Sequence, residues 1–282
     1  MPLMFNMLLE DADISSSDVR LLRHQTGKVP GRSPYTLWRD DVTAFEQYQS
    51  TQDPAKRARF DARYWASFVS PPGGGTLFVG LYEITHVGAV ADDAIDPLTG
   101  LAPGADKGGS NYDQYRCDRS DLLRDYIGRL HISWGVGSSH RAWVQRADRQ
   151  NKEIVELTRE FREEAFPGFT AFSLPLSDLP GVPIGWRAAL GAARGVYLLA
   201  CPRTREHYVG SADGADGFFG RWMDYVTTGH GGNAGMRIRD PSDYLVSVLE
   251  VAGSTAGRSD ILAMEEAWKR KLMSRSIGLN KN

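Results

Sequence analysis

The sequence predicts an α+β protein of two domains. Residues 1–183 are expected to form a mostly β, barrel-like domain with a helix near its start, and residues 184–282 a small antiparallel sheet flanked by helices. Three observations predict this architecture. The 282 residues exceed what one ordinary domain needs. Short runs of β-branched and aromatic residues alternate with glycine-rich turns in the first part of the chain. Three prolines then gather over residues 175–183, where a domain boundary is expected.

The composition excludes several classes of protein. With 41% apolar and 24% charged residues, the chain can build a core and is not wholly disordered. Cys117 and Cys201 lie far apart and form neither a disulfide framework nor a zinc motif, so a reducing cytoplasm is expected. No apolar run approaches the ~20 residues that cross a bilayer. The apolar start lacks the basic residues and cleavage site of a signal peptide, and no membrane partner is expected.

The net charge of −2 gives no electrostatic argument for nucleic-acid binding. From Arg194 to the end there are twelve basic and ten acidic residues, so this part is mildly positive and the rest mildly negative. That asymmetry alone does not predict a DNA-binding protein.

The first elements follow from periodicity and from proline positions. Residues 18–24 predict a strand, and the prolines over residues 30–34 end it. A helix is expected next, because apolar residues recur near helical spacing at Leu37, Trp38, Phe45 and Tyr48. Basic residues over 56–63 are interpreted as a solvated helix face in preference to a phosphate contact.

A hairpin is expected over residues 65–69 and 76–84, with the turn at residues 71–75. Residues 91–111 have no periodicity and predict a surface loop. Further strands are expected at 128–134 and 141–146, while 152–157 could be a strand or the start of a helix reaching residue 164. Several short strands with glycine-rich connections indicate a partly closed antiparallel barrel or a curled sheet.

The C-terminal part begins with a short helix at about residues 185–193. A hairpin over 195–199 and 207–211 follows, and it presents two tyrosines eleven positions apart, Tyr197 and Tyr208. A helix over 218–225 then carries Arg221 near its start and leads to a loop at 230–233. The last elements are a strand at 244–251 and a helix that holds Glu265 and Glu266.

This segment of about ninety residues resembles the GIY-YIG nuclease family. Five landmarks of that family occur in order, namely Gly195-Val196-Tyr197, Tyr208-Val209-Gly210, Arg221, Glu265 and Asn280. The Tyr-Val-Gly-Ser-Ala run, the later Gly-Arg-Trp and the His-Gly-Gly-Asn loop are most similar to the restriction-endonuclease-like branch. The resemblance implies a small antiparallel sheet with flanking helices and hydrolysis of phosphodiester bonds.

The resemblance implies a metal ion at Glu265. A single hard carboxylate suits Mg²⁺, with Mn²⁺ as its expected substitute, because Mg²⁺ keeps most of its ligands as water and substrate phosphate. Adjacent helix positions point about 100° apart, so only one of Glu265 and Glu266 can face the site. We choose Glu265 because its spacing to Trp268, Lys269 and Asn280 matches the family. Arg221 is expected to bind the scissile phosphate through its guanidinium fork.

The resemblance also implies that Tyr197 is the general base. Its unperturbed pKa of about 10 must then be lowered by a nearby cation. Tyr208 is expected to orient the water or Tyr197, and His230 to relay protons, although Tyr225, one turn after Arg221, could take the place of His230. Asn280 is expected either to fix the phosphate or to hold the Glu265 loop through hydrogen bonds.

The N-terminal domain is expected to select the DNA that is cut, because contacts to phosphate position a protein while contacts to bases specify the sequence. Its strands are rich in aromatic residues. Most of these are expected to be core, and two or three could instead line a pocket for a base turned out of the duplex, the candidates being Trp65, Tyr82, Trp134 and Trp143. The strand rhythm is loosely similar to PUA-like barrels that bind modified bases.

The function expected from these observations is a Mg²⁺-dependent endonuclease acting on double-stranded DNA. It is expected to be a restriction-type enzyme, specific for a sequence or for a base modification, in defence against foreign DNA. A repair or recombination nuclease, a catalytically silent DNA-binding module and an RNA-cleaving enzyme remain alternatives. Because one such site cuts one strand at a time, a homodimer on a palindromic site is the simplest arrangement for double-strand cleavage.

Overall fold

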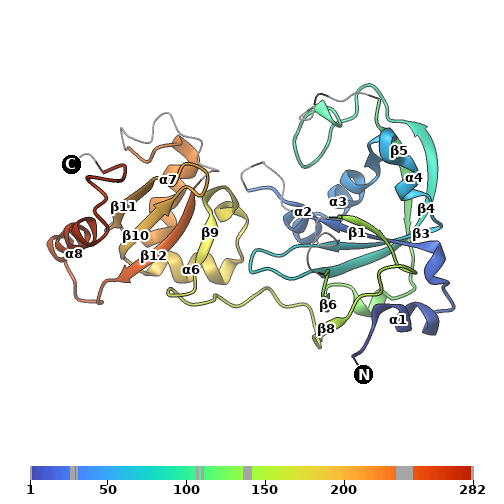
Figure 1. The fold of residues 1–282 in the computed structure, drawn as a ribbon, viewed down its shortest axis with the longest axis horizontal. Helices are drawn as coiled ribbons and strands as arrows, with labels where there is room; N and C mark the ends of the chain where they lie inside the picture. Colours follow the sequence, from blue (N-terminus) through green and yellow to red (C-terminus); the bar gives the residue numbers. More distant parts are fainter. Residues whose placement is uncertain are drawn as a thin grey trace. The chain divides into compact units, whose positions relative to one another are not determined.

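The computed structural model describes residues 2–25, 29, 31–105, 108, 111–135, 142–232 and 244–280. The chain divides into two compact units, residues 1–163 and residues 164–282 (Figure 1). The division lies after Glu163, so the segment at residues 164–183, expected to end the first domain, belongs to the second unit. Within the ranges that the structure describes, no helix combines the length and the apolar character needed to cross a membrane.

The first unit is built on one eight-stranded sheet that curls into an open half-barrel (Figure 1). Its main path runs β2-β5-β4-β3-β1-β7, and β6 pairs with both β4 and β8. The strands are β1 Val19–His24, β2 Thr51–Gln52, β3 Tyr64–Val69, β4 Leu77–Ala89, β5 Asp113–Arg119, β6 Leu130–Ile132, β7 Val144–Arg146 and β8 Ile154–Leu157.

The pairing of these strands differs in one respect from the expected antiparallel barrel. The hairpin of β3 and β4 is confirmed, and the segment at residues 152–157 is a strand, not the start of a helix. β1 and β3, however, run parallel, in register from Val19 opposite Tyr64 to His24 opposite Val69. The sheet is therefore mixed. Every residue of β3 is buried, which is typical of a strand covered on both faces.

The helices of the first unit are short. They are α1 Phe5–Asp11, α2 Pro34–Asp40, α3 Val42–Gln49 and α4 Arg57–Phe60, with 3-10 turns η1 Ser16–Asp18, η2 Pro54–Lys56 and η4 Arg124–Tyr126. The single helix expected around Leu37 to Tyr48 is in fact two helices. Asp41 separates them because its carboxylate accepts a hydrogen bond of 3.0 Å from the backbone N–H of Ala44 and so caps α3.

The second unit has a four-stranded antiparallel sheet in the order β11-β10-β12-β9 (Figure 1). The strands are β9 Ser173–Pro175, β10 Gly195–Ala200, β11 His207–Ala212 and β12 Leu245–Val251, and the helices are η5 Leu176–Gly181, α6 Ile184–Ala192, α7 Gly217–Thr228 and α8 Arg258–Lys271. The expected small antiparallel sheet with flanking helices is confirmed. β9 extends it with a strand that precedes residue 184.

The two faces of this sheet carry different helices. Tyr197 lies opposite Gly210, and Leu199 opposite Tyr208, so the two motif tyrosines share one face. α7 covers that face, where Trp222 packs edge-on against Tyr197 and stacks at 5.5 Å on Phe172. Ser211, of opposite alternation, contacts Glu265 of α8 on the other face. Side chains of α7 and of α8 nevertheless line one cleft at the end of β11.

Candidate active site

Two tyrosines and an arginine form a hydrogen-bonded cluster between β10 and α7. The hydroxyls of Tyr197 and Tyr225 share a hydrogen bond of 2.9 Å. The Nε of Arg221 donates to the Tyr197 hydroxyl at 3.2 Å, and its Nη2 donates to the Tyr225 hydroxyl at 3.3 Å. Arg221 and Tyr225 are four residues apart on α7, so they project from the same side of the helix, and the guanidinium lies 4.9 Å from the centre of the Tyr225 ring.

Gly210 gives this cluster its space. A Cβ at this position would lie 2.5 Å from the Tyr197 hydroxyl and 2.7 Å from a ring carbon of Tyr208. Tyr208 is itself buried on the same face, and its ring centre is 6.5 Å from that of Tyr225. The structure thus brings Tyr197, Tyr208 and Arg221 together as expected, with Tyr225 as a fourth member.

Gly195, in the first motif, has a different reason to be glycine. Its φ of +153° disfavours a side chain, and a Cβ there would lie 2.1 Å from the carbonyl oxygen of Glu250. The pairing of β10 with β12 shifts register between Val196 and Tyr197. The extra residue at this bulge is on β12, between Val248 and Glu250, and β10 keeps its regular alternation against β11.

Burial governs the protonation of the two hydrogen-bonded phenols. Desolvation raises the pKa of Tyr197 above its ordinary value of 10, and the positive charge of Arg221 opposes that rise. Desolvation also raises the pKa of Tyr225. Both phenols are therefore neutral at neutral pH. Tyr197 can act as a base only when further positive charge reaches the cluster.

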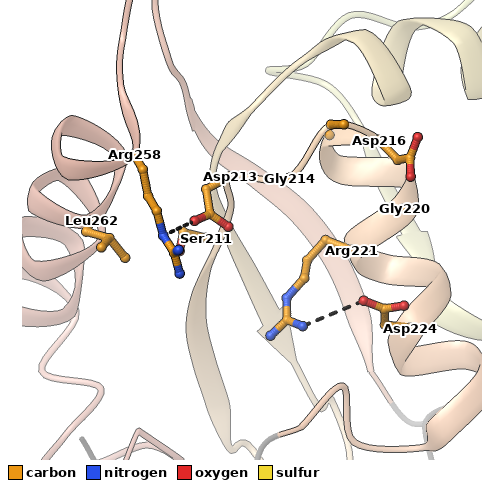
Figure 2. Close-up of a pocket in the computed structure, with 11 residues that line it drawn as sticks. Ser211, Asp213, Gly214, Asp216, Gly220, Arg221, Asp224, Arg258 and Leu262 are labelled. Carbon is orange, nitrogen blue, oxygen red and sulfur yellow. Dashed lines mark ion pairs between the residues drawn. The ribbon is translucent and has the colours of Figure 1, made fainter.

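An open cleft of about 460 Å³ lies beside Arg221 at the end of β11 (Figure 2). One wall is the start of α7, with Gly220, Arg221 and Asp224. The opposite wall is α8, with Arg258 and Leu262, and Ser211 together with residues 213–217 lies between them. Figure 2 shows the guanidinium groups of Arg221 and Arg258 on the two sides of the cleft. The lining also holds three carboxylates, Asp213, Asp216 and Asp224, so the two guanidinium groups, each of a kind that binds phosphate, face the open space together with acidic side chains.

Each arginine of the cleft has an acidic neighbour. Arg258 is held by Asp213 at 2.8 Å, and its side chain is 79% exposed. Arg221 lies 3.9 Å from Asp224 through Nη1, and its side chain is 31% exposed. The phenols accept from Nε and Nη2 of Arg221, so the Nη1 side of this guanidinium is the part turned to the cleft. The tyrosines thereby fix its orientation.

Glu265 lies at the edge strand, on the α8 side. The Ser211 hydroxyl donates to its Oε2, and its Oε1 lies 2.8 Å from Nζ of Lys269. The side chains of Glu265 and Lys269 are 10% and 4% exposed. Glu266 is instead 44% exposed and pairs with Lys269 at 3.1 Å and with Arg275 at 2.7 Å. Of the two glutamates, Glu265 alone reaches β11.

Glu265 and Ser211 carry the kind of oxygen donor that a hard divalent cation prefers, and in this structure Oε1 of Glu265 is paired with Lys269 while Oε2 accepts from Ser211. Over the described part of the chain no group of three or more His, Cys, Asp or Glu side chains could together hold a metal ion. Mg²⁺ needs no such cage, because one or two carboxylates with water and phosphate suffice. The carboxylate of Glu265 and the hydroxyl of Ser211 supply oxygen donors, and Ser211 itself lines the cleft.

Asn280 has a structural position. It is 1% exposed, its Oδ1 accepts from the Val209 N–H at 3.0 Å, and its Nδ2 donates to the Val209 carbonyl at 2.8 Å. Of the two roles expected for it, phosphate contact or a hydrogen-bonded support, the structure places it as a support, and the supported element is β11 instead of the Glu265 loop.

His230 lies in the turn after α7. Its Nδ1 accepts from the Gly232 N–H at 2.9 Å, and the neighbouring Gly231 sits so close to Tyr225 that a Cβ would lie 2.7 Å from the ring. Within the described ranges, no hydrogen bond joins the His230 ring to Tyr197 or Arg221. Tyr225 occupies that place in the cluster, and Asn233 of the expected loop lies outside the described residues.

Three of the four aromatic residues considered for a base pocket are core residues. Trp65 and Tyr82 have no exposed surface, and Trp134 is 3% exposed. The indole N–H groups of Trp65 and Trp134 donate to the carbonyls of Phe60 and Ala142. Trp143 differs, because it is half-buried and lines a cavity of the first unit.

The sequence also held signals for residues to which the sequence analysis assigned no role. Ser211 follows Gly210, and strand alternation alone puts it on the face opposite Tyr208. Lys269 lies four residues after Glu265, the spacing of an ion pair on a helix. Arg258 had no signal, since nothing in the sequence predicts that the first turn of α8 reaches the end of β11.

Comparisons of the chain with protein family models, with curated proteins and with solved structures give no match.

Proposed function

We propose that the second unit is a GIY-YIG nuclease domain that hydrolyses phosphodiester bonds of double-stranded DNA with Mg²⁺. The observation that carries the proposal is the position of Arg221. It is hydrogen-bonded to Tyr197 and Tyr225 on its buried side, and it faces a cleft with a second arginine, Arg258, on the opposite wall. Such a cleft would accept a phosphate between two cations, beside a pair of phenols.

The roles follow from this arrangement. Arg221, oriented by the phenols, binds the scissile phosphate, and Arg258 contacts the phosphate chain from α8. Tyr197 would first release its own phenolic proton to solvent and, as phenolate, would then take the proton of the attacking water, with Tyr225 hydrogen-bonded to its oxygen. Glu265 would hold Mg²⁺, which when bound would supply positive charge for the phosphoryl oxygens and the departing 3′ oxygen. Bound substrate and metal would also supply the charge that the buried Tyr197 needs to ionise.

We propose further that the enzyme is of the restriction type, and that the first unit selects the DNA. The curled half-barrel supports a PUA-like role at the level of architecture only. Cleavage of both strands would need two copies on one site, or successive nicks.

The experiment is Mg²⁺-dependent digestion of plasmid DNA beside phage DNAs that carry methylated, hydroxymethylated or glucosylated cytosine. Three proteins are compared: the natural chain, Glu265→Gln and Glu266→Gln. Glu265→Gln should lower the cleavage rate at least about 100-fold. Glu266→Gln changes the adjacent, exposed carboxylate and should cut like the natural chain.

Discrete fragments from plasmid would indicate sequence specificity, and cutting confined to one phage DNA would indicate dependence on a modification. Cutting of branched DNA alone would favour repair, and cutting of RNA alone would change the substrate. If the natural chain binds DNA but leaves every substrate intact, the nuclease proposal fails in favour of a binding module.

A further inference from the structure

A second cavity, of about 390 Å³, lies within the first unit. It is lined by the end of β1, the end of α3, the segment at residues 51–56 and Trp143 of the segment before β7. Its volume falls in the range of sites that hold small organic molecules. None of the residues of the candidate active site belongs to it.

Aromatic rings form much of its lining. Tyr48, Tyr112 and Trp143 all contribute to the wall. Behind them His24 is 3% exposed, with its ring centre 5.5 Å from that of Tyr48 and 6.2 Å from that of Trp143. Burial lowers the pKa of His24 to about 3, so this imidazole is uncharged at neutral pH. The wall therefore presents flat, uncharged rings.

The charges of the cavity balance. Its lining includes two cations, Arg23 and Lys56, and two carboxylates, Asp53 and Asp96. Lys56 and Asp53 form an ion pair at 3.1 Å, and Arg23 stacks 5.1 Å from the ring centre of Trp134. A cavity without net charge has little attraction for a free phosphate.

Polar groups lie among the rings. Gln52 is 6% exposed. Its side-chain Nε2 donates to the backbone carbonyl of Gln49 at 2.8 Å, and this hydrogen bond holds the amide group in place. Asp96 accepts the Leu98 N–H through Oδ1, which holds its carboxylate in place. An amide and a carboxylate on fixed supports can pair with the edge of a ring that carries both donors and acceptors.

We propose that this cavity binds a single nucleobase turned out of a DNA duplex, with Trp143 as its stacking surface. Enzymes that examine one base at a time stack the extruded base on aromatic side chains and hydrogen-bond its edge. The proposal rests on the proposed function, because it assumes DNA as substrate. It moves the base pocket from Trp65, Tyr82 and Trp134, which are core, to the cavity that Trp143 lines.

The test uses the full chain with Glu265→Gln, so that binding is measured without cutting. Fluorescently labelled duplexes carry one central cytosine, 5-methylcytosine, 5-hydroxymethylcytosine, adenine, N6-methyladenine, guanine or thymine, each opposite its complement or an abasic site. An unpaired base is easier to extrude. At least one base should therefore bind roughly tenfold more tightly opposite the abasic site, measured as Kd by fluorescence anisotropy.

Variants of the cavity lining test whether the tighter binding opposite an abasic site depends on the cavity. Trp143→Ala should abolish it, and Trp143→Phe, which keeps a stacking ring, should retain most of it. Asp96→Asn preserves an acceptor for the Leu98 N–H and should change which base gains most. If the thermal melt shows that Trp143→Ala does not fold, the change of base preference in Asp96→Asn becomes the test. An equal gain in all variants, or no gain for any base, overturns the proposal.

Two further arms separate the sources of failure. Free deoxynucleosides that bind as tightly as the duplexes would make the cavity a small-molecule site and overturn the assignment to DNA. Digestion with the active chain tests the nuclease separately: cutting without an abasic-site gain rejects only the base pocket, while a gain without cutting rejects only the nuclease.

Discussion

The phenol oxygens of Tyr197 and Tyr225 lie 2.9 Å apart, and Arg221 donates a hydrogen bond to each of them. Three side chains from one strand and one helix thus form a closed network with a single positive charge. The sequence motifs contain Tyr197 and Arg221. Tyr225 is outside the motifs and belongs to this network because it lies one turn after Arg221 on α7.

The first prediction concerns Tyr225. Tyr225→Phe keeps the buried ring and removes the hydroxyl that holds Tyr197 and Arg221. We expect kcat for DNA cleavage to fall about 10- to 100-fold, with a thermal midpoint close to that of the natural chain. His230→Ala is the comparison and should have the smaller effect, and the reverse order of the two rates would assign the relay to His230.

The second prediction concerns Asn280, which bonds both backbone groups of Val209. Asn280→Ala should lower the free energy of unfolding by about 2 kcal/mol, because two backbone groups lose their partners. Cleavage well below the thermal midpoint should change little. Ser276→Ala, at an exposed position of the same segment, is the matched control. A loss of cleavage with unchanged unfolding would instead place Asn280 on the phosphate.

The third prediction concerns the ion pair of Lys269. Burial alone would lower the pKa of this ammonium, yet the carboxylates of Glu265 and Glu266 raise it above 10.5. The raised pKa means that this stabilisation is complete below pH 10.5 and is lost as the pH rises through the folded-state pKa. Urea unfolding at pH 9 to 12 should show this fall, and Lys269→Met should remove it.

Lys269→Met also leaves Glu265 without its cation. It should destabilise the fold by about 3 kcal/mol near neutral pH. Lys271→Met, at a position two residues later on α8, provides the control for loss of a positive charge. Equal stability of the two variants would show that the pair contributes nothing.

The fourth prediction concerns Lys152 in the first unit. Its ammonium donates to the Trp134 carbonyl at 2.8 Å and to Gln145, and burial lowers its pKa from 10.5 to about 8. The unfolded chain therefore binds more protons between these two values, and stability attributable to this group rises with pH from about 8 to 10.5. Lys152→Met should abolish that rise, and a pH slope that is the same in both proteins would contradict the assignment.

Much of the fold could be predicted from local patterns. The hairpins of β3 with β4 and of β10 with β11 follow from β-rich runs separated by turn residues, and α7 and α8 follow from helical spacing. The positions of Tyr197 and Tyr208 on one face follow from alternation along paired strands.

Other elements lacked a local signal. β5 has only two apolar residues, Tyr115 and Cys117, among charged and amide side chains, and β9 has three residues that end in Pro175. The parallel pairing of β1 with β3 joins segments far apart in the chain. Trp65 and Tyr82 lie on strands that are buried on both faces, and a sequence cannot distinguish such a ring from one that lines a cavity.

The contacts that Leu279 and Asn280 make with the backbone of β11 also affect how two copies could associate. An outer strand ordinarily exposes a row of backbone groups on which a strand of another chain can dock. Here Leu279 donates to the His207 carbonyl at 2.8 Å, and the Asn280 amide occupies both groups of Val209. These three backbone groups are satisfied from within the same chain. A second copy could extend the sheet from β11 only by displacing these contacts of Leu279 and Asn280.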